Sequence, residues 1–406
     1  MGMSRIKNVW KSDEKTNLET RNKCSGCGAC ENSCPKQAIS MKYDNEGFLY
    51  PKIDENRCID CEKCIKVCPM SLYPEPKDYL KTYAGYSNKA EIIDNCASGG
   101  ICTAISEYII NQGGIVFGVK YTDDFIKAEY SKAETSDELK CFMTSKYVQS
   151  TKKNIYSSIK EEIRKNRLVA FIGCPCDVAA LHLYLGKDYE NLFTCELVCM
   201  GVTSYKVAEE YITQKEKKWG TLTGFNSKGK KYGWFVPCLE ETYSKGKKIS
   251  KSFFGTYYGF AFTKFQRPSC SQCPYRGKIG YADIRMGDFW GIKKTDEFWN
   301  EKGVSSIFVR TQKGVHLLEY IKDEFSLYEV NYEKAAVNNN MDLSKNYNEK
   351  QLEARQMFSD VFLTKGLVAA CRKYATKEFW IKYYVPLIFA NTLKHLRHLL
   401  TDKKTK

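Results

Sequence analysis

The chain has 406 residues, and its 63 Lys and Arg against 48 Asp and Glu give a formal net charge of +15. Hydrophobic residues make up 43% of the chain and charged residues 27%, which is typical of folded globular proteins and excludes a disordered or collagen-like chain. The length predicts about two to four domains. The chain also has 19 cysteines, and their placement is the most informative feature of the sequence.

The first residues and the hydropathy pattern predict a cytoplasmic protein. Residues 1–15 contain no apolar core of a secretory signal peptide. No uninterrupted run of about 18 apolar residues predicts a transmembrane helix. In a reducing cytoplasm, cysteines serve as metal ligands or buried thiols rather than as disulfides.

Eight cysteines between residues 24 and 68 form two copies of the spacing C-x2-C-x2-C-x3-C-P. This spacing is typical of paired [4Fe-4S] clusters, in which the fourth cysteine of each run ligates the other cluster. It predicts two ligand sets: Cys24, Cys27, Cys30 and Cys68 for one cluster, and Cys58, Cys61, Cys64 and Cys34 for the other. The alternative is a pair of zinc sites, but these use two separated C-x2-C pairs. Residues 21–72 resemble the two-cluster bacterial ferredoxin fold, an α+β module, after an N-terminal tail of residues 1–20.

The middle of the chain is predicted to be an α/β domain. Residues 73–82 contain prolines and charges and are interpreted as a linker. Strand-like runs then alternate with apolar residues at helical spacing. The predicted strands are 115–119, 168–173 and 192–198, and the predicted helices are 101–110 and 177–185. Near residue 330 the chain becomes polar and Asn-rich, which predicts a boundary before a linker and basic helical tail over 331–406.

Two glycine-containing turns precede the predicted helices, at residues 95–100 and 173–176. A helix N-terminus offers unpaired N–H groups that suit a phosphate, a flavin diphosphate or a cluster, although a plain turn is the simpler interpretation of either one. The second turn contains Cys174 and Cys176, and either could join Cys199, Cys270 and Cys273 in a third metal site. Buried structural thiols are the alternative.

At these residues the sequence resembles the family of coenzyme F420 hydrogenase/dehydrogenase beta subunits. The matching stretches lie between residues 83 and 330: 98–104, 145–150, 173–176, 197–202, 267–276 and 282–292. The resemblance implies an N-terminal-like domain over 83–155 and a C-terminal-like domain over 156–330. It also implies an FAD near a third [4Fe-4S] cluster. The implied cluster ligands are Cys176, Cys199, Cys270 and Cys273, and the implied flavin residues are Ser98, Gly99, Gly100, Ser145, Lys146 and Tyr147.

The sequence departs from the family pattern at three polar positions. Asp177 stands where the family has Gln, Met200 where it has His, and Asn226 where it has Arg. These losses remove groups that could contact a hydrogen-bonding or anionic substrate, which makes coenzyme F420 itself a doubtful ligand.

The sequence supports two functional hypotheses. In the first, the protein is an oxidoreductase that moves electrons between a hydride donor or acceptor at FAD and one-electron [4Fe-4S] carriers. In the second, it is a non-catalytic adaptor that relays electrons through its clusters to a partner enzyme. Both imply a redox partner protein or a ferredoxin-type carrier. No catalytic residue is identified, and no nucleic-acid-binding motif accompanies the positive charge.

The C-terminal segment is strongly basic. Residues 365–406 contain ten Lys and Arg against two acidic residues, together with aromatic and aliphatic side chains. Such a segment can lie on an anionic membrane surface. The other interpretation is a helix that packs on its own domain or on a partner protein.

Overall fold

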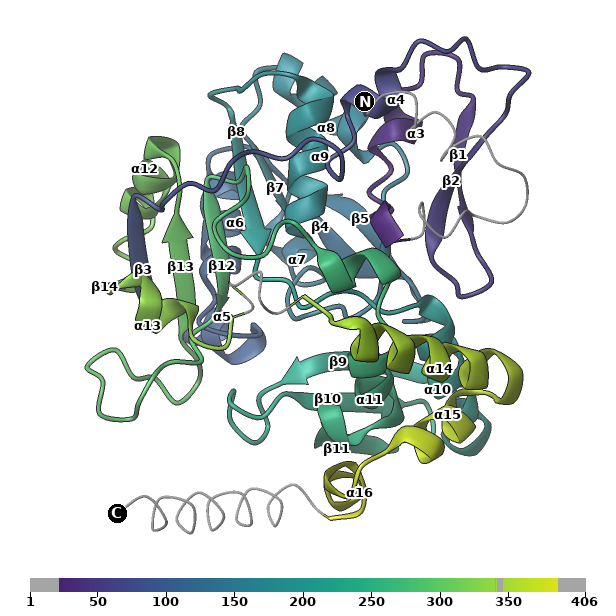
Figure 1. Cartoon of the computed structure of the whole chain (residues 1–406). Coiled ribbons are helices and arrows are strands. Elements are labelled where there is room, and N and C mark those ends of the chain that lie inside the picture. The colour runs from purple at the N-terminus through teal and green to yellow at the C-terminus, as the bar shows by residue number, and fades with distance from the viewer. Residues whose placement is uncertain (1–21, 340, 342–345, 386–406) are drawn as a thin grey trace.

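The computed structural model describes residues 22–339, 341 and 346–385 (Figure 1). Its described part has four components: a cysteine-rich N-terminal part, a large mixed sheet with helices, a small sheet, and helices at the C-terminal end. The predicted α/β class with a helical C-terminal segment is therefore confirmed for these residues. The end of the predicted basic tail, residues 386–406, lies outside the described residues.

The large sheet has nine strands in the order β14-β3-β13-β12-β8-β7-β4-β5-β6. Its centre is parallel, because β12 pairs in parallel with β8, β8 with β7, and β7 with β4. Antiparallel pairs join β12 to β13, β13 to β3 and β3 to β14 on one side, and β4 to β5 on the other. The strands are β3 Lys81–Ser87, β4 Ile115–Tyr121, β5 Ala128–Ala133, β6 Ser150–Thr151, β7 Val169–Gly173, β8 Leu192–Leu197, β12 Ile284–Asp288, β13 Ser305–Val309 and β14 Phe325–Glu329.

The strands and helices that the hydrophobic pattern predicts are present in the structure. The three predicted strands are β4, β7 and β8, and all five residues of β7 are buried. An uninterrupted apolar run suits a central parallel strand, which is covered on both faces. The two predicted helices are α6 (Ile101–Asn111) and α9 (Pro175–Leu185).

Helices cover both faces of the large sheet. Buried residues of α6 and α12 pack with one face, and those of α8 and α9 pack with the other. Besides α6 and α9, the helices around this sheet are α5 Ala90–Asn95, α7 Ser136–Leu139, α8 Ile155–Arg164, α12 Gln312–Tyr320 and α13 Tyr332–Ala336. Among the described residues, no helix is long and apolar enough to span a membrane.

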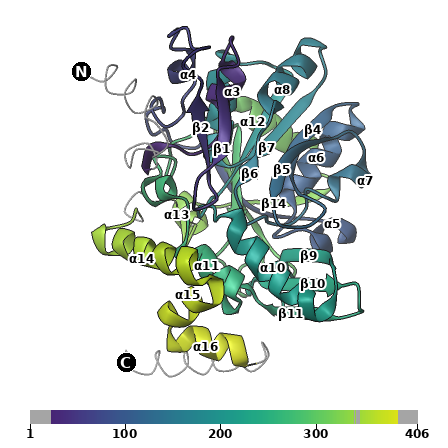
Figure 2. The same cartoon turned by 90° about the vertical axis from the view of Figure 1, so that its right-hand side faces the viewer.

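The cysteine-rich part consists of two short helices and a β-hairpin: α3 Ala29–Ser33, β1 Ile39–Tyr43, β2 Leu49–Ile53 and α4 Lys63–Lys66. Cys27, Ala29 and Val67 share a buried cluster with residues of α8 and α9, so this part packs directly on the large domain. Figure 1 shows α3 beside α8 and α9, and Figure 2 shows it beside α8.

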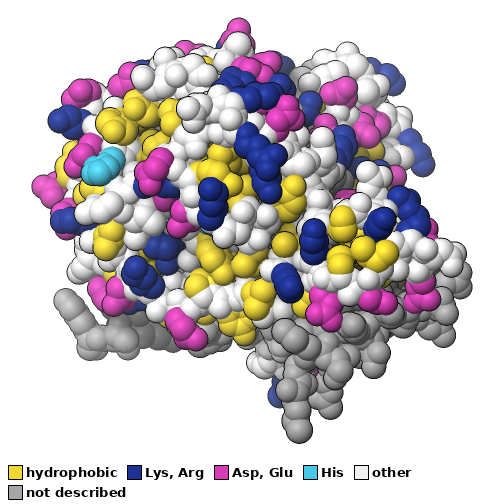
Figure 3. Space-filling view, turned by 90° about the horizontal axis from the view of Figure 1, so that it is seen from above, with side chains coloured by type: hydrophobic (Ala, Val, Ile, Leu, Met, Phe, Trp, Pro, Cys, Tyr) yellow, Lys and Arg dark blue, Asp and Glu magenta, His cyan; other side chains and the backbone are white. Residues whose placement is uncertain are grey.

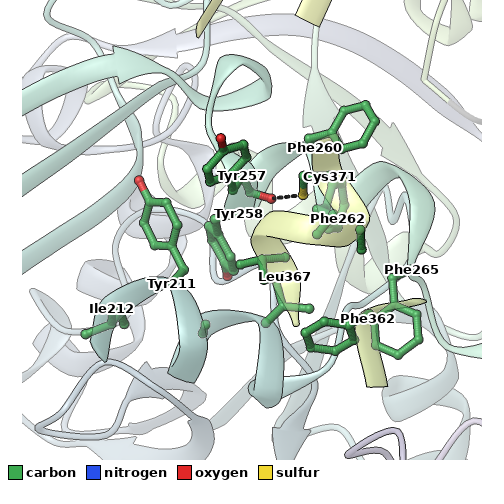
Figure 4. Close-up of a cluster of buried hydrophobic side chains, with 14 of the residues drawn as sticks. Tyr211, Ile212, Tyr257, Tyr258, Phe260, Phe262, Phe265, Phe362, Leu367 and Cys371 are labelled. Atoms are coloured by element: carbon green, nitrogen blue, oxygen red, sulfur yellow. Dashed lines mark hydrogen bonds between the residues drawn. The ribbon is translucent and has the colours of Figure 1, made fainter. Parts of the chain in front are cut away.

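The small sheet and the C-terminal helices form the other end of the molecule (Figure 2). The strand order is β11-β10-β9. A large aromatic core joins this sheet to the helices, and Figure 4 shows Tyr257, Phe260, Phe265 and Phe362 in it. The elements are β9 Leu222–Gly229, β10 Cys238–Tyr243, β11 Lys248–Ser252, α10 Tyr205–Trp219, α11 Tyr257–Lys264, α14 Glu349–Lys365, α15 Leu367–Tyr374 and α16 Lys377–Tyr384, with 3-10 helices η1 Phe253–Gly255 and η2 Pro268–Gln272.

Candidate functional site

Four thiols of the cysteine-rich part gather at site I, which we define as Cys24, Cys27, Cys30 and Cys68. Cys30 interacts electrostatically with the other three. The pKa of the Cys27 thiol is raised to about 12, mainly by burial and next by repulsion from Cys68. Burial likewise raises the pKa of Cys30 and Cys68, so these three side chains are neutral thiols at pH 7 unless a bound metal holds them as thiolates. The structure thus gathers at one place the thiols that the sequence predicts for one cluster.

The loop of site I requires glycine at Gly26. Its φ is +70°, and an added Cβ would lie 2.2 Å from the Gln149 side chain and 2.9 Å from the Leu49 carbonyl oxygen. The Gly26 N–H also donates to the Cys24 sulfur at 3.3 Å. The close backbone approach and the N–H···S contact suit a short loop around a cluster, because hydrogen bonds to sulfur are one of the means by which proteins tune clusters.

Site II comprises Cys34, Cys58, Cys61 and Cys64. These four cysteines line one small cavity of about 60 Å³, together with apolar side chains such as Ile39 and Ile65. The Ala38 N–H donates to the Cys34 sulfur at 3.2 Å. Cys34 belongs to the first sequence run and the other three to the second, so the crossed grouping that the spacing predicts is present in the fold.

Site II lies near the surface. Cys61 is exposed, and the neighbouring Ile59 is 56% exposed. Figure 3, which views the molecule from above Figure 1, shows hydrophobic side chains in patches among Lys and Arg. Site II is therefore accessible to solvent, whereas Cys24 and Cys27 of site I are buried.

Site III contains five cysteines from the ends of β7 and β8 and from η2: Cys174, Cys176, Cys199, Cys270 and Cys273. The sulfurs of Cys174 and Cys199 are 3.9 Å apart, and the Gly201 N–H donates to the Cys199 sulfur at 3.4 Å. Burial, then Asp177 and Cys273, hold the pKa of Cys176 well above its usual range. Cys273 in turn interacts with Cys270 and Cys199. Cys174 therefore contacts Cys199, and Cys176 interacts with Cys273 and Cys199.

Sites for one metal ion and sites for a cluster differ in how their thiols are arranged. In the described part of the chain, no three Cys, His, Asp or Glu side chains converge tightly enough to hold one metal ion. A structural zinc ion needs its sulfur ligands at about 2.3 Å from one centre. A [4Fe-4S] cluster binds its cysteines at separate iron atoms, so thiols that surround a common space suit it. None of the 19 cysteines, all of which are described, forms a disulfide.

Sites I and III are neighbours. The Tyr275 hydroxyl donates to the Pro69 carbonyl at 2.5 Å, directly after Cys68 of site I. Burial raises the pKa of Tyr275 and so do Cys176 of site III and Cys27 of site I, which locates this ring between the two sites. The fully buried Arg267, three residues before Cys270, donates to the Cys24 carbonyl at 2.7 Å.

The predicted flavin residues Ser98, Gly99 and Gly100 form the turn before α6. Gly100 has φ +88°, and a Cβ on Gly99 would lie 2.3 Å from the Gly85 carbonyl oxygen. The Ser98 hydroxyl donates to the Val304 carbonyl at 2.9 Å. These contacts fasten the turn to the large sheet, so its glycines have a structural role as well.

The second predicted segment, Ser145 to Tyr147, is partly buried. The Lys146 ammonium donates to the carbonyls of Met143 at 2.6 Å and Thr144 at 3.3 Å. Desolvation lowers the pKa of Lys146 to about 7. The Tyr147 ring packs against Phe253 and Phe262. The alternative interpretation of Tyr147 as a core residue is therefore consistent with its contacts.

A polar cavity of about 540 Å³ lies beside the turn that contains Ser98, and no motif in the sequence predicts it. Lys230 lines it and donates to the Ser98 carbonyl at 2.7 Å. Lys228 also lines it and forms a buried ion pair with Asp288. Burial raises the pKa of Tyr147, and the charge of Lys228 opposes this rise. The cavity thus lies next to the Ser98 turn, and one of its lysines interacts electrostatically with Tyr147. Other residues that line it are Asp94, Asn95, Cys96, Asn226, Lys231, Glu240, Glu301 and Lys302.

Comparisons with known proteins match three regions of the chain. Residues 82–154 match the N-terminal model of the coenzyme F420 hydrogenase/dehydrogenase beta subunit, and residues 166–335 match its C-terminal model. Residues 23–72 match a 4Fe-4S dicluster domain.

Individual relatives cover most of the chain at low identity. A subunit of the F(420)H(2) dehydrogenase of Methanosarcina mazei is 23% identical over 75% of this chain and 84% of its own length. A coenzyme F420-dependent sulfite reductase of Methanocaldococcus jannaschii is 25% identical over 77% of this chain and 47% of its own length. A chain of the F420-reducing [NiFe] hydrogenase complex of Methanosarcina barkeri aligns with a TM-score of 0.46 at 21% identity, covering 70% of this chain and 92% of that one. With both halves of the beta-subunit model and the dicluster domain matched in order, the chain belongs to the family of coenzyme F420 hydrogenase/dehydrogenase beta subunits, as an iron-sulfur electron-transfer protein of the oxidoreductase type.

Proposed function

We propose that the protein is a cytoplasmic iron-sulfur flavoprotein that transfers electrons between a two-electron hydride donor or acceptor and one-electron carriers. The observation that carries this proposal is the lysine-lined cavity beside the Ser98–Gly100 turn and Tyr147. FAD, when bound, would supply the exchange between two-electron and one-electron chemistry. Lys230, Lys231 and Lys302 line the cavity, and their ammonium groups would form charge-assisted hydrogen bonds with the oxygens of a diphosphate placed away from the carboxylates of Asp94, Glu240 and Glu301.

The thiol sites define the proposed path for electrons. We assign one [4Fe-4S] cluster to each of sites I, II and III, with Cys176 rather than Cys174 as the ligand at site III. Tyr275 supports adjacency of sites I and III, because it contacts Pro69 and interacts with thiols of both. Exposure of Cys61 and Ile59 supports site II as the end that meets a redox partner or ferredoxin-type carrier.

Anaerobic purification of the full chain tests the proposal. We expect about 12 iron atoms per chain, as three four-iron clusters require, and one flavin that is released on denaturation. Iron without any flavin would contradict the proposal and favour the second hypothesis, in which the protein is an adaptor that relays electrons and has no substrate of its own. Mixing the protein with candidate hydride carriers, coenzyme F420 and NADH, and following flavin bleaching would then identify the substrate class.

We also propose peripheral membrane contact through the outer side of α16. Its inner side packs on the protein, since Phe379 is buried against Tyr257 and Phe260. On the outer side, Ile381 is 47% and Tyr384 69% exposed. Flotation with anionic liposomes tests this idea with Ile381→Ser/Tyr384→Ser, which leaves the packed side intact. Unchanged flotation of this variant would exclude α16 as the contact.

A further inference from the structure

A buried ion pair lies between sites I and III. The Lys152 ammonium is 3.1 Å from Asp177 Oδ1, with side chains only 6% and 3% exposed. Lys152 also donates to the Ser150 carbonyl at 3.0 Å, and the Tyr130 hydroxyl donates to Asp177 Oδ2 at 3.0 Å. The two charges are therefore fixed in position and shielded from water.

Each partner belongs to a segment that carries or touches a thiol site. Asp177 directly follows Cys176 in the first turn of α9 and is close enough to affect both Cys176 of site III and Cys27 of site I. Lys152 interacts with Cys174 and Cys176. On its other side, a Cβ built on Gly28, next to Cys27, would lie 3.4 Å from the Lys152 Cβ.

A charge pair in this place can affect electron transfer through the reduction potentials of nearby clusters. Charges interact more strongly in a buried, low-dielectric region than at the surface. The reduction potential of an iron-sulfur cluster depends on net charge, hydrogen bonds and exposure around it. Because a cluster becomes more negative on reduction, a nearby carboxylate disfavours reduction and a nearby ammonium favours it.

We propose that Lys152 and Asp177 set the reduction potentials of the clusters at sites I and III, and thereby the ease of electron transfer between them. Both are positioning residues rather than ligands. This inference rests on the proposed function only in requiring clusters at these two sites, and it does not require a flavin. It gives a specific role to Asp177, where the sequence departs from the Gln of the family pattern.

A redox titration of the full anaerobic protein, followed by electron paramagnetic resonance, tests the proposal. For Asp177→Asn we expect the reduced-to-oxidised ratio of the clusters at sites I and III to rise about tenfold at a fixed potential, a positive shift of about 59 mV for a one-electron couple. Lys152→Met should shift both potentials in the opposite direction, and the double variant should return near the wild-type values. Site II should change less, because solvent near the exposed Cys61 screens the charge.

Glu241→Gln is the matched control, because it removes one carboxylate from the buried Lys215–Glu241 ion pair near the small sheet. Unshifted potentials in Asp177→Asn with about 12 iron atoms retained would overturn this inference while leaving the proposed function intact. The same shift in Glu241→Gln would also overturn it, since the effect would then be general. About eight iron atoms in the wild-type protein would overturn both the third cluster and this inference.

Discussion

Arg355 and Glu46 form a buried bidentate ion pair between segments that are 309 residues apart in the sequence. The two guanidinium nitrogens lie 2.7 and 2.6 Å from the two carboxylate oxygens, and the Ser359 hydroxyl donates to the same carboxylate. Glu46 lies in the turn of the N-terminal hairpin and Arg355 in α14. The pair therefore fixes the cysteine-rich part against the C-terminal helices.

Removing Arg355 should destabilise the folded protein strongly. Arg355→Ala removes the charged partner of the buried Glu46 carboxylate, and loss of one partner of a buried pair lowers the free energy of unfolding by about 3–5 kcal/mol. Urea unfolding of the anaerobic protein, followed by circular dichroism, measures the change. Lys140→Ala, which breaks the exposed pair with Asp137, should leave the midpoint unchanged. Equal effects of the two substitutions would refute a special role for the buried pair.

The crossed assignment of cysteines to sites I and II can be tested by pairs of substitutions. Cys24 and Cys68 share site I, so Cys24→Ser/Cys68→Ser should lose only one cluster, about four iron atoms. Cys24 and Cys34 belong to different sites, so Cys24→Ser/Cys34→Ser should lose two clusters, about eight iron atoms. Iron analysis under anaerobic conditions distinguishes these outcomes. The reverse result would mean that each sequence run holds its own cluster.

The sequence was most informative where function depends on local spacing. Strands β4, β7 and β8 and the grouping of thiols follow from periodicity and from fixed cysteine intervals. The lysine-lined cavity was missed because Lys228 and Lys230 on and after β9 meet the turn after α5 only in the fold, more than 130 residues away in sequence. The run of basic residues around Lys230 was the only sequence signal for this cavity. A run of lysines on a solvent-exposed surface has the same sequence pattern, so the signal did not distinguish the two.

Site III shows a similar limit. Cys174 contacts Cys199, and Cys176 interacts with Cys199 and Cys273, because the start of α9 brings two positions of one short segment to the same place. The spacing of the cysteines alone does not show which of the two is the ligand.

We expect Cys176 to be the ligand. Cys176→Ser should then lose about four iron atoms, whereas Cys174→Ser should retain all three clusters. Iron content and the resonance spectrum of each single variant provide the measurement. Loss of the cluster in Cys174→Ser alone would transfer the assignment to that residue, and loss in neither variant would show that site III holds no cluster.

Charge in the polar cavity should control flavin binding. Lys230→Gln removes an ammonium that lines the cavity and should weaken FAD binding about tenfold, as expected for a lost hydrogen bond to a charged group of about 1.5 kcal/mol. Lys302→Gln should have a smaller effect, because this side chain is 47% exposed and already pairs with Asp94. Fluorescence titration of flavin-depleted protein gives the affinities, with the exposed Lys187→Gln as control. Unaltered affinity in both cavity variants would place the flavin elsewhere.

Lys146 should make stability depend on pH in an unusual direction. Desolvation lowers the pKa of its amine from 10.5 to about 7. Between these values the unfolded chain binds a proton that the folded chain does not, so this residue makes the free energy of unfolding rise with pH. Below pH about 7 both states are protonated and the destabilisation is fully present. The melting temperature of the wild-type protein should therefore increase relative to that of Lys146→Met from pH about 7 to about 10. A parallel pH dependence of the two proteins would show that the Lys146 amine is solvated. Lys140→Met, which removes an amine at an exposed position, should keep the pH dependence of the wild type.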